Sequence, residues 1–496
     1  MLLTKKFDRT KQIVLLSWIF IVSVQIQLLA NDSFLEFDED DFPAEKETGL
    51  FNWSGDSWSA TIKGNISNLT GIHQSNKASI LNPDNELSVP KAENGSRLVV
   101  DIDASFREQS KFFMQNDVFV EYQKKEDETE EKSERKINQC HLTFEFGDET
   151  ASFLTIGKQR IKWGVGAFWN PVDTVNSHKT LSELEKEKEG KTAYRLDIAW
   201  PSSSFTGIWV PNSDETDFRS ENFSRQADHS LLAGRIYAYF WDSDISLYLS
   251  KKEKQNLKRG FSFSTVFGNS QIFAETIQWV GKSETVYPSK RSERTDGVDP
   301  VSTLPFTFPA TYTFENKEGT VVKSLLGFQY TDQNDVTYIG EIYYNHQGYN
   351  QEEMEAYVEF LRYLEQDYQN DLESLAKVKA ANAAFDLPGS YSRNDLLNAG
   401  NALYDFADLR QYYLHLFLGK SHVANRFDLG LDIVLNLDEY FEQGEASFFS
   451  RLSLAYTAAV NWLFTFYSQH YYGNDKSEFG MFYYENALFG EIKYYF

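Results

Sequence analysis

The chain ends in Ala487-Leu-Phe-Gly-Glu-Ile-Lys-Tyr-Tyr-Phe496, and this stretch decides the fold. Counted two residues at a time, one face holds Leu488, Gly490, Ile492, Tyr494 and Phe496, and the other holds Phe489, Glu491, Lys493 and Tyr495. A half-apolar pattern of period two predicts a β-strand. A soluble sheet rarely leaves such an edge uncovered, whereas a barrel removes the edge by pairing its last strand with its first. The stretch favours a closed barrel over the last strand of a soluble sheet.

The amino end predicts export. Four basic residues precede an apolar run at 13–24, and the small Ala30 stands before a polar stretch; the four are Lys5, Lys6, Arg9 and Lys11. This order is that of a cleaved secretory signal. The run is shorter than the roughly 20 residues of a spanning helix. We expect a signal peptide at 1–30, an acidic periplasmic leader at 31–56 and an outer-membrane β-barrel at 57–496.

Composition narrows the function classes. The net charge of -25 argues against nucleic acid as a partner. Cys140 is the only cysteine, so no intrachain disulfide can form, and His/Cys metal spacings and Gly-rich phosphate loops are absent from the sequence. The histidines are scattered and no Gly-x-Ser-x-Gly nucleophile motif occurs. We expect no metal, no cofactor and no enzymatic activity.

About eighteen alternating segments follow the leader, with a range of 16–18. The clearest are 98–106, 194–200 and 427–437, each with one apolar face of the length that a tilted membrane strand needs. Short connections alternate with long ones, which are typical of outer-membrane barrels; the long ones are 67–97, 124–138, 161–192, 212–230, 281–321, 347–407 and 470–486. The sequence predicts an all-β transmembrane antiparallel barrel with both ends of the chain on the short-turn side.

Two of the long connections have a character of their own. Residues 124–136 are almost all charged, which indicates a solvated, mobile loop. Residues 351–385 carry apolar residues at helical spacing, and Ser392 with Asp395 forms the pattern of a capping box after the break at Pro388. We expect a helical hairpin in an insertion at 351–406. It can be an outer cap packed on its own apolar stripe, a lid that enters the lumen, or a pair of helices that binds a partner.

Two stretches resemble known proteins. The terminal strand ending in Phe496 resembles the closing strand of bacterial outer-membrane barrels, which the barrel-assembly machinery reads. Residues 155–173, Thr-Ile-Gly-Lys-Gln-Arg-Ile-Lys-Trp-Gly-Val-Gly-Ala-Phe-Trp-Asn-Pro-Val-Asp, resemble a signature of porin-like outer-membrane barrels of the alginate-export type and related uncharacterised proteins. The resemblance covers about twenty residues and implies the architecture rather than a solute.

The motif can also be interpreted residue by residue. Its members are Gly157, Gln159, Arg160, Trp163, Gly164, Asn170, Pro171 and Asp173. Gly157 allows close packing or a bulge, and the Asn-Pro pair starts a turn that the aspartate can stabilise. Trp163 and Trp169 are typical of an outer aromatic girdle. Residues 161–192 either fold inward and narrow a pore, or only end a strand and anchor a loop. Lys158 and Arg160 share parity with apolar Leu154 and Ile156, so either Gly157 shifts the register or both cations extend to the rim.

The polar faces of the strands would line the lumen. The candidate lining residues are Asp101, Asp103, Asp117, Glu121, Glu145, Arg195, Asp197, Arg235, Glu275, Glu341, Asp428, Asp432, Arg451, Glu491 and Lys493. An acidic lining favours cations, although paired charges can simply stiffen the wall. We expect a porin-like channel for passive diffusion of small hydrophilic solutes, leaning toward cations. Alternatives are a surface adhesin or structural barrel with acidic loops, and a plugged, substrate-specific transporter. The sequence leaves the oligomeric state open.

Overall fold

The computed structural model describes residues 51–55, 57–106, 109–125, 129–147, 151–176, 190–211, 230–290, 312–362, 397, 401 and 403–496. The strands are β1 (Phe51–Gly55), β2 (Trp58–Ser75), β3 (Ala92–Phe106), β4 (Ser110–Lys124), β5 (Thr129–Phe146), β6 (Ser152–Gln159), β7 (Lys191–Trp200), β8 (Ser203–Val210), β9 (Leu231–Phe240), β10 (Ser243–Lys252), β11 (Lys258–Phe267), β12 (Ser270–Lys290), β13 (Tyr312–Thr331), β14 (Val336–Asn345), β15 (Tyr412–Val423), β16 (Phe427–Asn436), β17 (Phe448–Ala459), β18 (Trp462–Tyr472) and β19 (Tyr484–Tyr495). A short 3-10 helix spans Pro83–Asn85, and α4 spans Leu437–Gln443.

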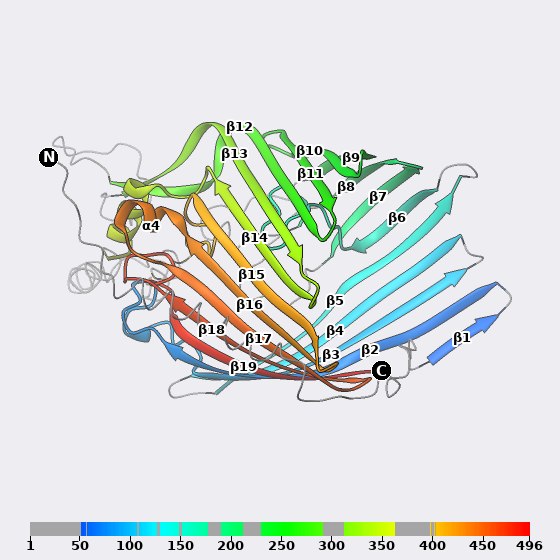
Figure 1. The fold of residues 1–496 in the computed structure, drawn as a ribbon, viewed down its shortest axis with the longest axis horizontal. Coiled ribbons are helices and arrows are strands. Elements are labelled where there is room, and N and C mark those ends of the chain that lie inside the picture. Colours follow the sequence, from blue (N-terminus) through cyan, green and yellow to red (C-terminus); the bar gives the residue numbers. More distant parts are fainter. Residues whose placement is uncertain are drawn as a thin grey trace, which may run out of the picture.

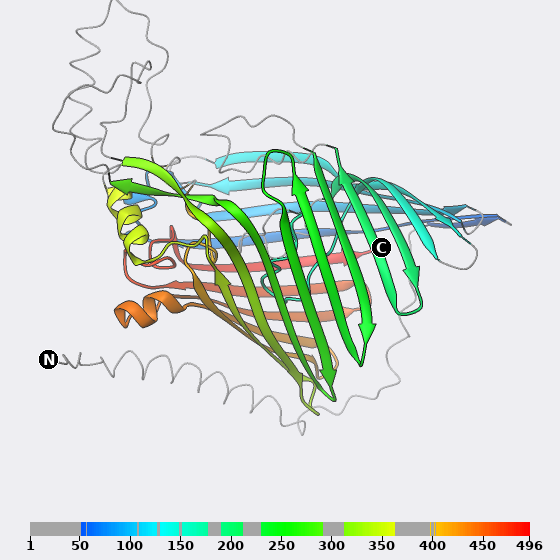
Figure 2. The ribbon, with the colours of Figure 1, turned by 90° about the horizontal axis from the view of Figure 1, so that it is seen from above.

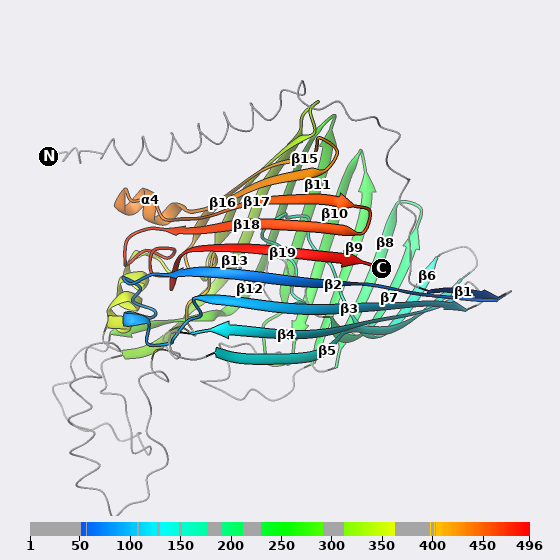
Figure 3. The same cartoon turned by 90° about the horizontal axis from the view of Figure 1, so that it is seen from below.

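The strands β2 to β19 form one closed ring. Each pairs antiparallel with the next in the chain, and β19 pairs with β2, as Figure 3 shows where the two lie side by side. The result is an 18-stranded antiparallel β-barrel, which confirms the fold class and the strand number expected from sequence (Figure 1). The short strand β1 pairs with residues 58–62 of β2, beyond the end of β19.

The last residue takes part in closing the ring. The Phe496 N–H donates to the Gly64 carbonyl oxygen and the Gly64 N–H donates to the Phe496 carbonyl oxygen, both at 2.9 Å. A β-carbon on Gly64 would lie 2.9 Å from the Phe496 ring and would overlap the Val99 carbonyl oxygen. Glycine at this position therefore lets the terminal ring and the neighbouring strand approach closely.

The two faces of the wall differ as the alternation predicts. Large apolar side chains point outward and remain exposed, among them Ile236, Leu247, Leu326, Ile342 and Leu452. Exposed aromatic residues flank this belt at both ends: Trp58, Trp200, Trp241 and Trp462 lie at tight turns, and Tyr194, Trp209, Tyr412 and Tyr472 lie toward the long connections. An apolar belt between two aromatic girdles is the outer surface of a membrane-spanning barrel.

Several hairpins are longer than the alternation alone indicated. The charged residues 129–136 belong to β5, and Lys124 of β4 pairs with Thr129. The expected mobile loop at 124–138 is therefore largely a paired ribbon, because backbone hydrogen bonds hold a ladder whatever its side chains. The hairpins β2–β3 and β12–β13 likewise extend into the loops expected at 67–97 and 281–321.

The barrel has a turn end, where the chain makes tight turns such as those after β7 and β9, and a loop end with the long connections. At the loop end residues 351–362 are helical, where the first helix of the hairpin was expected. The expected signal at 1–30, residues 31–50 of the leader, and residues 363–396 of the helical insertion lie outside the described residues. No helix among those described is long and apolar enough to cross a membrane.

Candidate functional site

A segment between β6 and β7 enters the barrel; its residues 160–176 are called the crossing segment here. It leaves the wall after Gln159, whose buried amide donates to the Ala193 carbonyl oxygen at 3.1 Å. The Arg160 guanidinium turns inward and donates to the Gln115 amide oxygen at 2.7 Å. The pairing of β6 continues through Gly157 without a register shift, which contradicts the first of the two alternatives given for Lys158 and Arg160. The positive φ of Gly157 (124°) and the approach of the Cys140 backbone explain the glycine.

Both ends of the crossing segment pack on the inner wall of β7 to β10. Its apolar side chains share one buried cluster with those of the wall: Ile161, Trp163, Val172 and Val175 pack with Ala193, Ile208, Val210, Leu231, Ala233 and Tyr248. The rings of Trp163 and Tyr248 lie 5.5 Å apart. An inward-facing apolar patch on these strands therefore receives the segment.

Two carboxylates from the far wall hold the middle of the segment. Glu275 of β12 accepts hydrogen bonds from the backbone N–H groups of Val165, Gly166 (3.0 Å) and Val172 (3.4 Å). Glu341 of β14 accepts from those of Ala167 (2.6 Å) and Phe168 (2.9 Å). The two carboxylates are 2% and 0% exposed. Because β14 is eight strands from β6 around a ring of 18, the segment crosses the lumen rather than following the wall.

Trp169 anchors the segment among aromatic residues of the same wall. Its ring stacks on Tyr343 at 4.9 Å and lies 5.7 Å from Tyr413, and its indole N–H donates to the Ala407 carbonyl oxygen at 3.0 Å. Trp163 and Trp169 are 5% and 9% exposed, so their assignment to the outer girdle is wrong. Both indoles instead attach the crossing segment to the inner wall, and the girdle consists of other residues.

The glycines and the turn of the motif shape the segment. Gly164 has a φ of 100°, and a β-carbon there would lie 2.7 Å from the Glu275 carboxylate. Residues 170–173 form the expected turn, with the Asp173 N–H donating to the Asn170 carbonyl oxygen at 3.0 Å. The Asp173 carboxylate in turn accepts from the Asn176 N–H at 3.2 Å. These contacts make the segment compact enough for its backbone N–H groups to converge on the two carboxylates.

On the wall that the crossing segment contacts, titratable side chains of neighbouring strands β14 to β17 are bonded to one another. His415 of β15 contacts Glu341 at 3.0 Å and Asp432 of β16 at 3.4 Å, and Asp432 contacts Arg451 of β17 at 3.2 Å. The Phe168 ring lies 4.8 Å from the His415 ring. His415 was noted in the sequence only as one of several scattered histidines, and its strand register was the signal that could have placed it beside Glu341.

Other expected lining residues are also paired. Arg97 bonds Asp117 at 2.6 Å, Arg195 bonds Asp197 at 2.7 Å, and Lys63 lies 3.7 Å from Asp103; Lys493 lies 3.3 Å from Glu491. Asp428 and Glu145 are exposed and lie near tight turns, where the Asp428 carboxylate accepts from the His422 N–H at 2.9 Å. Arg235 of β9 stands opposite Thr206 and Tyr248, and Glu121 of β4 is half-buried opposite Gly95; Asp101 pairs in register with Lys63.

The loop end carries a second buried cluster, called the roof cluster here. It joins the β2–β3 loop, helix 351–362, the β14–β15 connection and the β18–β19 loop, through Ile80, Leu81, Tyr349, Met354, Tyr357, Val358, Phe360, Leu361, Leu403, Leu409 and Met481. Val286 and Tyr287 of β12 pack against it. Residues 363–396 of the insertion lie outside the described residues, so the outer cap, the lid and the partner-binding helix pair all stay predictions.

Two buried carboxyl groups join the loops beside the roof. Glu478 accepts hydrogen bonds from the Ala407 N–H, the Tyr413 hydroxyl and the Asn436 amide at 2.8–2.9 Å. Glu439 of α4 accepts from the Glu478 N–H at 2.8 Å. Burial raises the pKa of Glu439 to about 7 and the pKa of Glu478 well above its ordinary value. These loops are therefore joined by groups whose neutral form is favoured.

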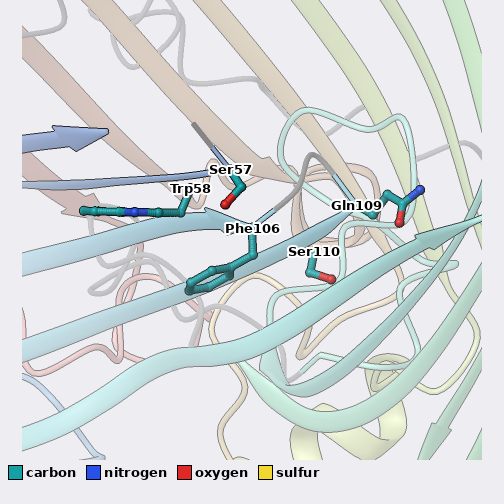
Figure 4. Close-up of a pocket in the computed structure, with 5 residues that line it drawn as sticks. All are labelled: Ser57, Trp58, Phe106, Gln109 and Ser110. Atoms are coloured by element: carbon teal, nitrogen blue, oxygen red, sulfur yellow. The ribbon is translucent and has the colours of Figure 1, made fainter. Parts of the chain in front are cut away.

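A shallow open pocket of about 600 Å³ lies at the turn end, lined by Ser57, Trp58, Phe106, Gln109 and Ser110. Figure 4 shows the Trp58 and Phe106 rings side by side at the ends of β2 and β3. Both rings are exposed, at 45% and 49%. They belong to the girdle at the turn end and lie far along the wall from the crossing segment.

A closed antiparallel barrel with an apolar belt, two aromatic girdles and a polar interior is a bacterial outer-membrane β-barrel. The chain matches no family model, and no curated protein matches it. Similar solved structures include the outer membrane protein OprD from Pseudomonas aeruginosa, with 9% identity, a TM-score of 0.46, and coverage of 88% of this chain and 94% of that one. Another is OccAB1 from Acinetobacter baumannii, with 10% identity, a TM-score of 0.46, and coverage of 88% and 96%.

Proposed function

We propose that the chain is an outer-membrane channel through which small hydrophilic solutes diffuse passively. The observation that carries the proposal is a ring of 18 strands whose interior is crossed by the anchored segment 160–176. A barrel of this size is wide enough for a water-filled path unless the interior is filled. The crossing segment packs in clusters formed with β7 to β10 and β12 to β17, and among its described residues only Arg160 bonds β4 and β5 on the opposite side, through Gln115 and Gln139.

In this proposal the crossing segment is the constriction. Its exposed side chains include Lys162 and Ala167, whereas its tryptophans are buried in the wall. The motif residues then act on permeation indirectly, by fixing the position of the segment. Glu275 and Glu341 act as its anchors, so they are not free charges in the path.

The proposed ion preference is a modest one for cations. The acidic excess of the chain favours cations in principle. However, Asp117, Asp197 and Asp432 each pair with an arginine on their own or a neighbouring strand. Paired charges have a smaller net field, so we expect a cation preference well below that of an unpaired acidic ring.

Single-channel recording of the refolded chain in planar bilayers tests the function. A salt gradient across the bilayer should give steady current steps and a reversal potential displaced slightly toward the cation value. A refolded barrel that shows the heat-dependent gel shift of a closed ring and passes no current would refute an open channel.

The roof cluster favours one second candidate, a plugged transporter for a specific substrate. In that case loops from several sides of the ring fill the path until a substrate binds. Such a barrel would pass little current in salt alone, and its current would change only when its substrate is added.

We also propose that residues 1–30 are removed on export and that Phe496 presents the last strand to the barrel-assembly machinery. The reciprocal hydrogen bonds of Phe496 with Gly64 support the second point, because the terminal residue completes the seam. Removing Phe496 should lower the amount of barrel in the outer membrane of a producing cell, measured by fractionation. An unchanged amount of barrel in the outer membrane would argue against recognition of Phe496 by the assembly machinery.

A further inference from the structure

Loops from opposite sides of the barrel meet at its loop end. β3 and β12 are nine steps apart in a ring of 18, which is half of the circumference. Nevertheless Leu81 of the β2–β3 loop and Val286 and Tyr287 of β12 belong to or pack on the same roof cluster. The connection between these sides therefore passes over the mouth, with helix 351–362 between them (Figure 3).

The β12–β13 hairpin reaches this position by a kink. Gly281 and Gly319 stand opposite each other in the ladder, with φ of 134° and 121°. A β-carbon on Gly319 would meet no atom within 4 Å, so space does not explain the glycine, whereas its backbone conformation does. The ladder is also irregular just beyond, between Lys282 and Val286. Both strands thus change direction at one rung, and the part beyond bends toward the helix in Figure 2.

The part beyond the glycines, residues 282–290 and 312–318, is called the arm here. The Lys317 ammonium pairs with the Glu353 carboxylate at 2.8 Å and donates to the Gly348 carbonyl oxygen at 2.6 Å. The two paired side chains are only 13% and 11% exposed. The Phe314 ring meets the Phe360 ring edge-on at 5.5 Å.

Two more contacts of the arm involve its backbone. The Tyr349 hydroxyl donates to the Val286 carbonyl oxygen at 2.7 Å, and the Glu284 N–H donates to the Gln347 amide oxygen at 2.7 Å. At the base of the arm the Glu284 carboxylate pairs with Lys258 at 2.6 Å. These contacts of the described arm residues with residues 346–362 surround the buried Lys317–Glu353 pair.

We propose that the arm is a hinged lid, which pivots at Gly281 and Gly319 and is held closed by the Lys317–Glu353 pair. The proposal rests on the channel function proposed above and adds control of access at the loop end. A glycine pair at one rung provides the bend, because hinge motion is absorbed by a few backbone positions. The Lys317–Glu353 pair is the latch. Removing one partner of a buried ion pair leaves the other charge buried and uncompensated, which costs far more free energy than exposing both partners to water.

Charge reversal at the latch tests the lid. Lys317→Glu places two carboxylates together and should raise the open fraction of single channels about tenfold, within the usual range of coupling between sites. The swap Lys317→Glu with Glu353→Lys should restore the original open fraction. Lys282→Glu is the matched control, because its partner Glu318 lies within the arm and both side chains are exposed, at 69% and 72%. An open fraction unchanged by Lys317→Glu, or a swap that restores nothing, would overturn the lid.

A second measurement does not depend on current. Ser79 is 2% exposed in the β2–β3 loop, directly before Ile80 of the roof cluster, and its hydroxyl donates to the carbonyl oxygen of Met481, another member of that cluster, at 2.6 Å. In a Cys140→Ser background, a Ser79→Cys thiol should react with a bulky maleimide about tenfold faster when Lys317→Glu is present. Equal rates would refute the lid even in a barrel that does not conduct. Faster labelling without current would keep the lid and refute the open channel.

Discussion

Replacing Glu341 by Gln tests whether the crossing segment is held by the far wall. The carboxylate accepts from the backbone N–H groups of Ala167 and Phe168 at 2.6 Å and 2.9 Å. A Gln keeps one acceptor oxygen and turns a donor toward the second N–H, so one charge-assisted hydrogen bond is lost. Such bonds contribute about 1.5–3 kcal/mol each. A loss of about 2 kcal/mol raises the population of the detached segment roughly thirtyfold.

Single-channel recording measures this population directly. The Glu341→Gln channel should show larger or flickering current steps, since the segment leaves the centre of the lumen for part of the time. Glu491→Gln is the matched control, because Glu491 faces the same lumen but pairs with Lys493 on its own strand at 3.3 Å. If the two variants and the original chain give the same step size and noise, the crossing segment is not the constriction.

Three further predictions concern the seam, the wall and the outer loops. Gly64→Ala should reduce the yield of heat-resistant barrel severalfold, because its β-carbon would meet the Phe496 ring, whereas Gly490→Ala, with no atom within 4 Å, should not. Asp117→Asn should destabilise the barrel by about 1.5–3 kcal/mol in urea unfolding, since it removes the charge-assisted hydrogen bonds that the buried Asp117 carboxylate accepts from Arg97. The pKa of Glu439 rises on folding from 4.5 to about 7, so the folded loops bind its proton more tightly. The stability that Glu439 contributes is then full below about pH 4.5 and falls by roughly 3 kcal/mol as the pH rises to 7; protease cleavage of the loops should increase over this range and should increase less steeply in Glu439→Gln, where the raised pKa of Glu478 still acts in the same direction.

The wall was predictable because alternation is a local property. In 194–200 and 427–437 every second residue is apolar, and these residues face outward in β7 and in β16 as far as Leu435, whereas Leu437 begins α4. The lipid requires this pattern on nearly every strand, so it survives without any knowledge of the partners. The even number of strands followed from the same pattern together with the alternating lengths of the connections.

The pattern failed where the interior is filled. The segments near Phe273 and Phe449 alternate poorly because these residues face inward, at 2% and 0% exposure, and pack in the cluster that receives Trp169. An inward aromatic residue looks like an outward one in a sequence. The poor alternation was thus a signal of the contact with the crossing segment.

The partners of the motif could not be predicted for a related reason. Tryptophan is a residue type expected in an aromatic girdle, so the sequence alone suggested that position for Trp163 and Trp169. Only the three-dimensional path of the chain shows that both lie inside the barrel. Glu275 and Glu341 do face inward, but the groups that donate hydrogen bonds to them are backbone N–H groups more than 100 residues away in the chain. Long-range backbone contacts leave no periodic trace in a sequence.

The strand β1 also limits how the barrel can close. Sliding β19 by two residues toward the turn end would preserve the inward and outward faces but would change the stagger of the ring, and with it the diameter. That slide would bring Phe496 opposite Ile62, a rung that Phe51 of β1 already occupies. The strand β1 thus blocks the last strand from sliding toward the turn end and excludes the ring that such a slide would produce.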